Sequence, residues 1–148
     1  MLTEGTVGHD GAVIADREPC ARFVAVGDSF TEGLNDEIRG DGRYRGWADR
    51  VAELLGARQN IEQLSYANLA IRGRLMRQIR DEQVPQAQAL TPDLVTVGAG
   101  VNDALRRTFS LDVVCTDLEN SVRDLTVTGS HVLLFCLLYT SPSPRDNR

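Results

Sequence analysis

The chain has 148 residues, of which 42% are hydrophobic, and these values fit one globular domain rather than two. Its formal net charge of −5 argues against binding to a nucleic-acid backbone. No run of about 18 apolar residues occurs, and the N-terminus lacks the basic and then apolar pattern of a signal peptide. We therefore expect a soluble, cytoplasmic protein without a membrane span.

Two residue types limit the chemistry further. All 16 basic residues are Arg, so a phosphate-binding loop with Lys, a pyridoxal Schiff base and a Ser-x-x-Lys pair are excluded. Cys20, Cys115 and Cys136 are far apart and odd in number, which indicates neither a disulfide framework nor a zinc site. We expect no metal ion and no cofactor.

The chain divides into three parts. Residues 1–21 show no periodicity and are predicted to form a flexible N-terminal arm, and the domain follows over residues 22–135. In that domain short apolar segments alternate with amphipathic ones. We expect strands at 22–26, 61–70, 93–99 and 131–135, with amphipathic segments at 44–56, 74–84 and 112–129.

This alternation predicts an α/β fold with a parallel sheet and helices on both faces. In the first amphipathic segment one helical face carries Trp47, Val51, Leu54 and Leu55, and Gly56 is a candidate C-cap. Right-handed crossovers place the carboxyl ends of all parallel strands at one edge of the sheet, where open α/β folds bind ligands. Candidate sites should therefore follow the strands directly.

Three short motifs occupy such positions: GDS at 27–29, NLAIRG at 68–73 and GVND at 100–103. Each alone is a common turn or helix start. Together they form a coherent acyl-transfer site, because a Ser hydroxyl that attacks a carbonyl needs donors directed at the resulting oxyanion. The Ser29 and Gly73 N–H groups and the Asn102 side-chain amide are candidate donors.

These motifs, in this order and at this spacing, resemble those of the SGNH hydrolases, the GDSL-type esterases and lipases. The resemblance covers about residues 22–135 and implies a three-layer α/β/α, flavodoxin-like fold. It also implies that a small-molecule ester is hydrolysed through an acyl-Ser29 intermediate, with Ser29, Gly73 and Asn102 as oxyanion donors. Phe30 replaces the family's Leu, and Thr31 stands where the α/β-hydrolase motif requires Gly, which disfavours that other class.

The general base is missing from this pattern. Members of the family carry the catalytic His and its Asp in a late D-x-x-H motif, but neither His9 nor His131 has Asp three residues before it. His131 begins a predicted strand, which places it about 15 Å from the catalytic edge. We expect Asp28 and Asp103 to fix loops rather than act as bases, because an ordinary carboxylate is a weak base for a Ser proton.

The C-terminal segment offers an explanation. Residues 136–146, CLLYTSPSPRD, end the pattern in mid-strand and read codon by codon as the translated end of a transposase-based sequencing adapter. We expect residues 136–148 to be a tail that is not native, so that the last strand and the D-x-x-H loop are missing. A hydrolase truncated in this way is predicted to be inactive as printed.

Two other classes stay open from the residues alone. The first alternative is a non-catalytic α/β domain that binds a small ligand through the same loops. A nucleotide-binding domain ranks third, because the first loop lacks the G-x-G-x-x-G spacing. Arg72 and Arg74, on either side of Gly73, are candidates for attracting an anionic or sugar-bearing ester. The acyl group, the alcohol and the oligomeric state are not defined by the sequence.

Overall fold

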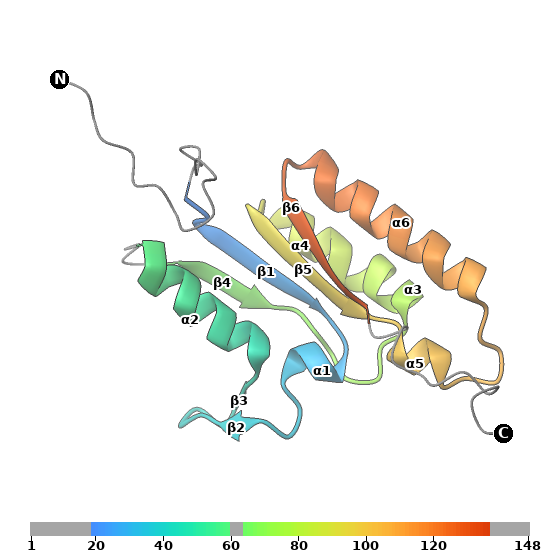
Figure 1. The fold of residues 1–148 in the computed structure, drawn as a ribbon, viewed down its shortest axis with the longest axis horizontal. Helices are drawn as coiled ribbons and strands as arrows, with labels where there is room; N and C mark the ends of the chain where they lie inside the picture. Colours follow the sequence, from blue (N-terminus) through green and yellow to red (C-terminus); the bar gives the residue numbers. More distant parts are fainter. Residues whose placement is uncertain (1–18, 60–63, 137–148) are drawn as a thin grey trace, which may run out of the picture.

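The computed structural model describes residues 19–59 and 64–136 (Figure 1). Most of the predicted N-terminal arm, His9 within it, and the predicted tail from residue 137 onward lie outside the described residues. Cys20 and Ala21 are described, and their N–H groups donate to Gln59 Oε1 and Asp93 Oδ2 at 2.7 and 2.9 Å.

The centre of the molecule is a four-stranded sheet in the order β4-β1-β5-β6 (Figure 1). Every neighbouring pair in it is parallel. The last predicted strand therefore lies beside the third. The strands are β1 (Arg22–Gly27), β4 (Ser65–Asn68), β5 (Leu94–Ala99) and β6 (His131–Cys136).

Helices cover both faces of this sheet, which confirms the predicted three-layer α/β/α fold (Figure 1). One face carries α2 (Trp47–Gln59). The opposite face carries a continuous helical segment and the long helix α6. These elements are α3 (Met76–Gln78), the π turn η1 (Ile79–Gln83), α4 (Val84–Ala89) and α6 (Leu111–Val127).

The two cores follow from the alternation of side chains along β1. Val24 and Val26 point to the α3–α6 face, whereas Phe23 and Ala25 point to α2. All four are almost completely buried. Because β1 is covered on both faces, its near-continuous apolar sequence is what a central parallel strand requires.

The structure corrects three details of the predicted elements. Strand β4 ends at Asn68 rather than at the predicted residue 70, and residues 61–63 of the predicted strand lie outside the described residues. Helix α2 continues through Gly56 to Gln59, so Gly56 is not its C-cap. Leu54 was expected on the buried face but is 62% exposed, whereas Asp49 is buried and accepts a hydrogen bond from Gly46 N–H.

Shorter elements connect the strands to these helices. The turns α1 (Ser29–Glu32) and α5 (Val101–Ala104) directly follow β1 and β5. A small antiparallel hairpin, β2 (Glu37–Ile38) and β3 (Tyr44–Arg45), precedes α2 and was not predicted. Within the described ranges no helix is long and apolar enough to cross a membrane.

Strand β6 forms one edge of the described sheet. Its only described partner is β5, and Leu133, Leu134 and Phe135 are each about half exposed. An apolar edge strand with unpaired N–H and C=O groups is a template for pairing with another chain. The β6 edge is therefore a surface prone to self-association.

We predict that the chain self-associates through this edge and that Leu133→Lys reduces the association, because a charge on an edge strand opposes strand addition. Static light scattering across a concentration series measures the effect. The matched control is Leu105→Lys, at a residue 79% exposed outside any strand. A monodisperse monomer of the unchanged chain would contradict the prediction.

Candidate functional site

The three predicted motifs meet at one edge of the sheet. Because β1, β4 and β5 are parallel, the loops that follow them all leave from the same side. Figure 1 shows α1, the loop after β4 and α5 close together at this edge. The sequence separates these segments widely, so only the sheet topology brings them together.

Ser29 is the first residue of α1, directly after β1. Asp28 caps this turn, because its Oδ1 accepts a hydrogen bond of 3.1 Å from Phe30 N–H. Ser29 is partly exposed, and among the described residues nothing is hydrogen-bonded to its hydroxyl or its N–H group. Both groups are therefore available to a ligand from within the described part of the chain.

Gly73 lies in the loop that follows β4. Its φ of +75° is in the left-handed region that side chains other than Gly rarely adopt, and a Cβ there would point into open space. The loop is fixed on its N-terminal side, where Arg72 N–H donates to Glu32 Oε2 at 2.9 Å and Ile71 N–H donates to Gly27 O at 3.2 Å. Gly73 is thus held beside the turn that carries Ser29.

Asn102 joins the other two loops. Its Nδ2 donates to Arg74 O at 3.1 Å and approaches Asp28 Oδ2 at 3.5 Å. Arg74 adjoins Gly73, and Asp28 adjoins Ser29. One side-chain amide therefore spans the neighbours of both other predicted site residues, and the structure brings all three loops together.

Asp28 and Asp103 brace loops, as expected from the sequence. Asp103 Oδ2 accepts from Met76 N–H at 2.9 Å and so ties α5 to the start of α3. Asp28 is only 3% exposed. Burial raises the pKa of Asp28, and the nearby Asp103 charge raises it further, while the hydrogen bond from Phe30 N–H acts in the opposite direction.

Small residues allow the nucleophile turn to lie close to the sheet. A Cβ on Gly27 would come within 2.4 Å of Gly98 O, and a Cβ on Gly98 would come within 2.5 Å of Thr31 Oγ1. Thr31, in α1, is completely buried against these two glycines. Any larger side chain at either Gly would lift α1, and Ser29 with it, away from the strand ends.

His131 lies at the opposite end of the sheet. It pairs with Leu94, the first residue of β5, and its N–H donates to Asp93 O at 2.8 Å. The strand lengths therefore separate it from Ser29, as the sequence predicted. Among the described residues no group of three or more His, Cys, Asp and Glu side chains could hold a metal ion.

The structure adds an aromatic cluster that the sequence did not indicate. Phe30 stacks on Trp47 and on Phe135, with ring centroids 6.1 and 5.5 Å apart, and Trp47 and Phe135 are 5.8 Å apart. Phe30 directly follows Ser29, and the three rings come from α1, α2 and β6. No short-range pattern links these segments, so only the fold reveals the apolar surface beside Ser29.

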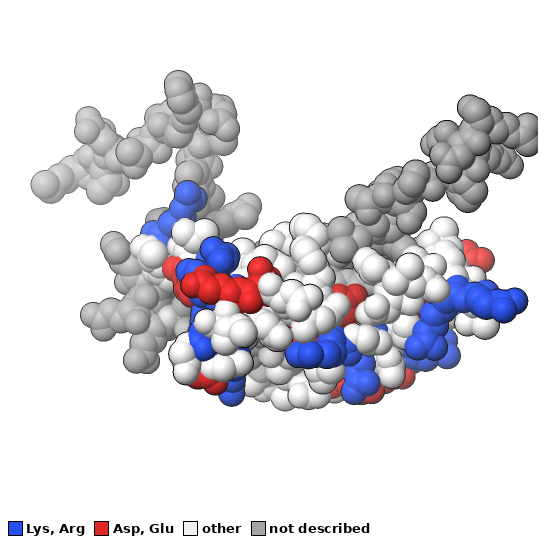
Figure 2. All heavy atoms as spheres, turned by 90° about the horizontal axis from the view of Figure 1, so that it is seen from below, with Lys and Arg blue, Asp and Glu red and all other residues white. Residues whose placement is uncertain are grey.

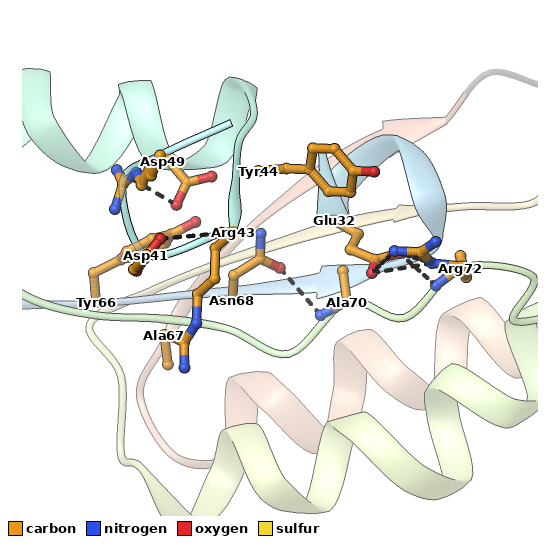
Figure 3. Close-up of a pocket in the computed structure, with 12 residues that line it drawn as sticks. Glu32, Asp41, Arg43, Tyr44, Asp49, Tyr66, Ala67, Asn68, Ala70 and Arg72 are labelled. Atoms are coloured by element: carbon orange, nitrogen blue, oxygen red, sulfur yellow. Dashed lines mark hydrogen bonds and ion pairs between the residues drawn. The ribbon is translucent and has the colours of Figure 1, made fainter. Parts of the chain in front are cut away.

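A cavity of about 780 Å³ lies beside α1 and is lined by residues of the β2–β3 hairpin, β4 and the loop after β4 (Figure 3). Its wall includes Glu32, one turn after Ser29, and Arg72, next to Gly73. The other lining residues are mostly polar: Arg39, Asp41, Gly42, Arg43, Tyr44, Asp49, Tyr66, Ala67, Asn68 and Ala70.

The arginines on either side of Gly73 are ion-paired. Arg72 bonds Glu32 through both Nε and Nη2 and lies over the ring of Tyr44, and Arg74 pairs with Glu82 at 2.9 Å. On the face drawn in Figure 2, basic and acidic side chains are likewise interspersed. The expected attraction of an anionic ester by these two arginines is therefore weakened by partners already in place.

Solved structures with the same fold are esterases and a lipolytic protein. A catalytic mutant of Axe2, an acetylxylan esterase from Geobacillus stearothermophilus, is 20% identical with a TM-score of 0.61, over 77% of this chain and 58% of that one. The esterase EstA from Pseudoalteromonas sp. is 16% identical with a TM-score of 0.62, over 82% of this chain and 64% of that one. A putative G-D-S-L family lipolytic protein from Desulfitobacterium hafniense is 20% identical with a TM-score of 0.62, over 82% of this chain and 62% of that one.

The chain thus spans about six-tenths of the length of these structures. Comparison with curated protein sequences gave no match. The sequence profile of the GDSL-like lipase/acylhydrolase family, in contrast, matches residues 25–148, which is most of the chain. The matched region includes all three strand-end motifs. The chain belongs to the GDSL-like lipase/acylhydrolase family.

Proposed function

We propose that the three strand-end loops form the acyl-transfer site of a serine ester hydrolase. Ser29 Oγ attacks the carbonyl carbon of an ester and forms a C–O bond, while its proton passes to a base and then to the departing alcohol. Water then attacks the acyl-Ser29 ester, which releases the acid and restores the hydroxyl. Neither a metal ion nor a cofactor takes part.

One observation carries this proposal: the Asn102 amide contacts the neighbours of both Ser29 and Gly73. The Ser29 and Gly73 N–H groups and Asn102 Nδ2 then serve as donors to the oxyanion. The bond from Asn102 to Arg74 O keeps the amide in place. Its second hydrogen faces Asp28 Oδ2 at 3.5 Å, a weak contact that an oxyanion can replace.

The base has to come from outside the described residues, because His131 lies at the far end of the sheet. We therefore propose that the chain as printed has the nucleophile and the oxyanion donors but turns over poorly. Loss of members of a catalytic triad lowers turnover by about 10⁴ to 10⁶, and about 10³ to 10⁴ over water remains from the oxyanion site and binding.

The cavity beside α1 supports an uncharged rather than an anionic substrate. It is lined by three carboxylates and three guanidinium groups, so their formal charges cancel. Glu32 and Arg72 already pair with each other, as do Arg39 and Asp49 at 3.8 Å. An anion would have to compete with these carboxylates, whereas a neutral ester with hydroxyl groups would not.

We predict that a fluorophosphonate probe labels the full chain slowly at Ser29 and that added imidazole increases the rate, because free imidazole replaces the absent base. Intact-mass and peptide mass spectrometry measure the rate and the labelled residue. Ser29→Ala abolishes the labelling, and His131→Ala leaves it unchanged.

The His131 variant is the matched control for the only described histidine. Labelling that is independent of Ser29, or lost in His131→Ala, would contradict the proposed mechanism. A folded chain that stays unlabelled with imidazole present would favour the alternative, a non-catalytic ligand-binding domain.

A second prediction concerns Asp28. Since burial raises its pKa above the ordinary 3.8, protonated Asp28 contributes stability below 3.8, and that stability is lost as pH rises through the folded-state pKa. Asp28→Asn carries no charge and keeps an oxygen that accepts from Phe30 N–H. It should gain stability over the unchanged chain across this window, and the difference should be constant at higher pH.

Urea unfolding at a series of pH values, from below 3.8 to neutrality, measures this difference. Asp41→Asn, on the exposed hairpin loop, is the control for the loss of one carboxylate. A stability difference for Asp28→Asn that shrinks as pH rises would overturn the assignment.

A further inference from the structure

We propose that Gln83 is a positioning residue for the turn that carries Ser29. Its side chain replaces a hydrogen bond between β1 and β4 that is lost at the end of β1. This inference rests on the proposed role of Ser29. Gln83 lies 56 residues from Gly27, is completely buried and contacts no reacting group.

The missing hydrogen bond is identified from the regular hydrogen-bond pattern between β1 and β4. Ser65 and Leu69 N–H groups donate to Ala21 O and Ala25 O at 2.9 and 2.8 Å, and Ile71 N–H donates to Gly27 O at 3.2 Å. By the regular alternation of a parallel pair, Gly27 N–H should donate to the carbonyl of Leu69. The chain leaves the sheet after Asn68, and Gly27 N–H donates to Gln83 Oε1 instead, at 2.8 Å.

The Gln83 side-chain amide makes two hydrogen bonds to the backbone of Gly27. Its Nε2 also donates to Gly27 O at 2.9 Å, so one planar side chain satisfies both backbone groups of Gly27. Gly27 is buried, and its carbonyl also accepts from Ile71 N–H, so Gly27 N–H is the group that loses its partner when the amide is removed. The amide therefore does for Gly27 N–H what a neighbouring strand does for the N–H groups of the rest of β1 on this side.

A π turn brings this side chain to the sheet. Gln83 is the last residue of η1, and both Gln83 and Val84 are buried although they are consecutive. The wider turn lets an apolar and a polar side chain enter the interior together. Val84 joins the apolar core, while Gln83 reaches the end of β1.

The position of Gly27 determines that of Ser29. Only Asp28 separates the two residues, and Asp28 N–H is itself bonded to Gly98 O at 3.3 Å. The Ser29 hydroxyl and N–H thus start from a backbone that is held by β5 on one side and by Gln83 on the other. Without Gln83 the second side keeps only the bond of 3.2 Å from Ile71 N–H to Gly27 O, and Gly27 N–H has no other partner among the described residues.

Three variants of the full chain test the proposal. Gln83→Met keeps the length of the side chain but removes both hydrogen bonds. Gln83→Glu reproduces the donor and the acceptor only when its carboxyl group is protonated. Gln86→Met is the matched control, at an exposed position whose amide bonds only Glu82 O on the same helical segment.

Two readouts are measured. Amide hydrogen exchange followed by NMR reports Gly27, with Ala25 on the same strand as the internal reference. In Gln83→Met we expect exchange at Gly27 to rise about 10-fold relative to Ala25, and imidazole-supported labelling of Ser29 to slow by about the same factor. Gln86→Met should change neither.

Gln83→Glu supplies a signature that simple packing would not give. Relative to the unchanged chain, Gly27 exchange and Ser29 labelling should both be close to normal at low pH. As the carboxyl group ionises, exchange should become faster and labelling slower, because a carboxylate cannot donate to Gly27 O and repels it. Unaltered Gly27 exchange in Gln83→Met would overturn the proposal. So would a Gly27 exchange rate in Gln83→Glu that keeps the same ratio to that of the unchanged chain at every pH. Failure of Ser29 labelling in the unchanged chain would count against the proposed function alone, since the exchange readout does not depend on it.

Discussion

The parallel pairing of β1 with both β4 and β5 is the constraint on which the site depends. It places the ends of three strands at one edge, although the loops after them are far apart in the sequence. A side chain from one loop can then reach the others, as Asn102 does when it donates to Arg74 O. The candidate site is therefore a consequence of strand direction and register rather than of any single motif.

Close packing and polar bracing act together at this edge. The glycines of the central strands allow α1 to lie directly on the sheet, and the buried Thr31 fills the space that their missing side chains leave. Gln83 holds a backbone N–H group where the ladder between β1 and β4 has ended, and Asp103 holds one at the start of α3. Stability and the proposed chemistry thus share the same contacts, because each brace fixes a loop that carries a candidate donor.

The sequence predicted the layers and the meeting of the three loops, because alternation, right-handed crossovers and parallel pairing follow from local patterns. It mispredicted the end of α2, since Gly56 within a helix costs only about 1 kcal/mol and packing can overrule it. It missed Gln83 and the stack of Phe30 on Phe135, which depend on contacts between distant segments. A polar residue inside an amphipathic segment was the only signal for Gln83, and by itself it does not identify a partner.

The central claim is that donors from three loops face one point beside Ser29. A crystal structure of the chain with a phosphonate attached to Ser29 Oγ tests it most directly. The account predicts that one phosphonyl oxygen accepts hydrogen bonds from the Ser29 and Gly73 N–H groups and from Asn102 Nδ2. An adduct whose oxygens all point to solvent, with Asn102 still directed at Asp28, would contradict it.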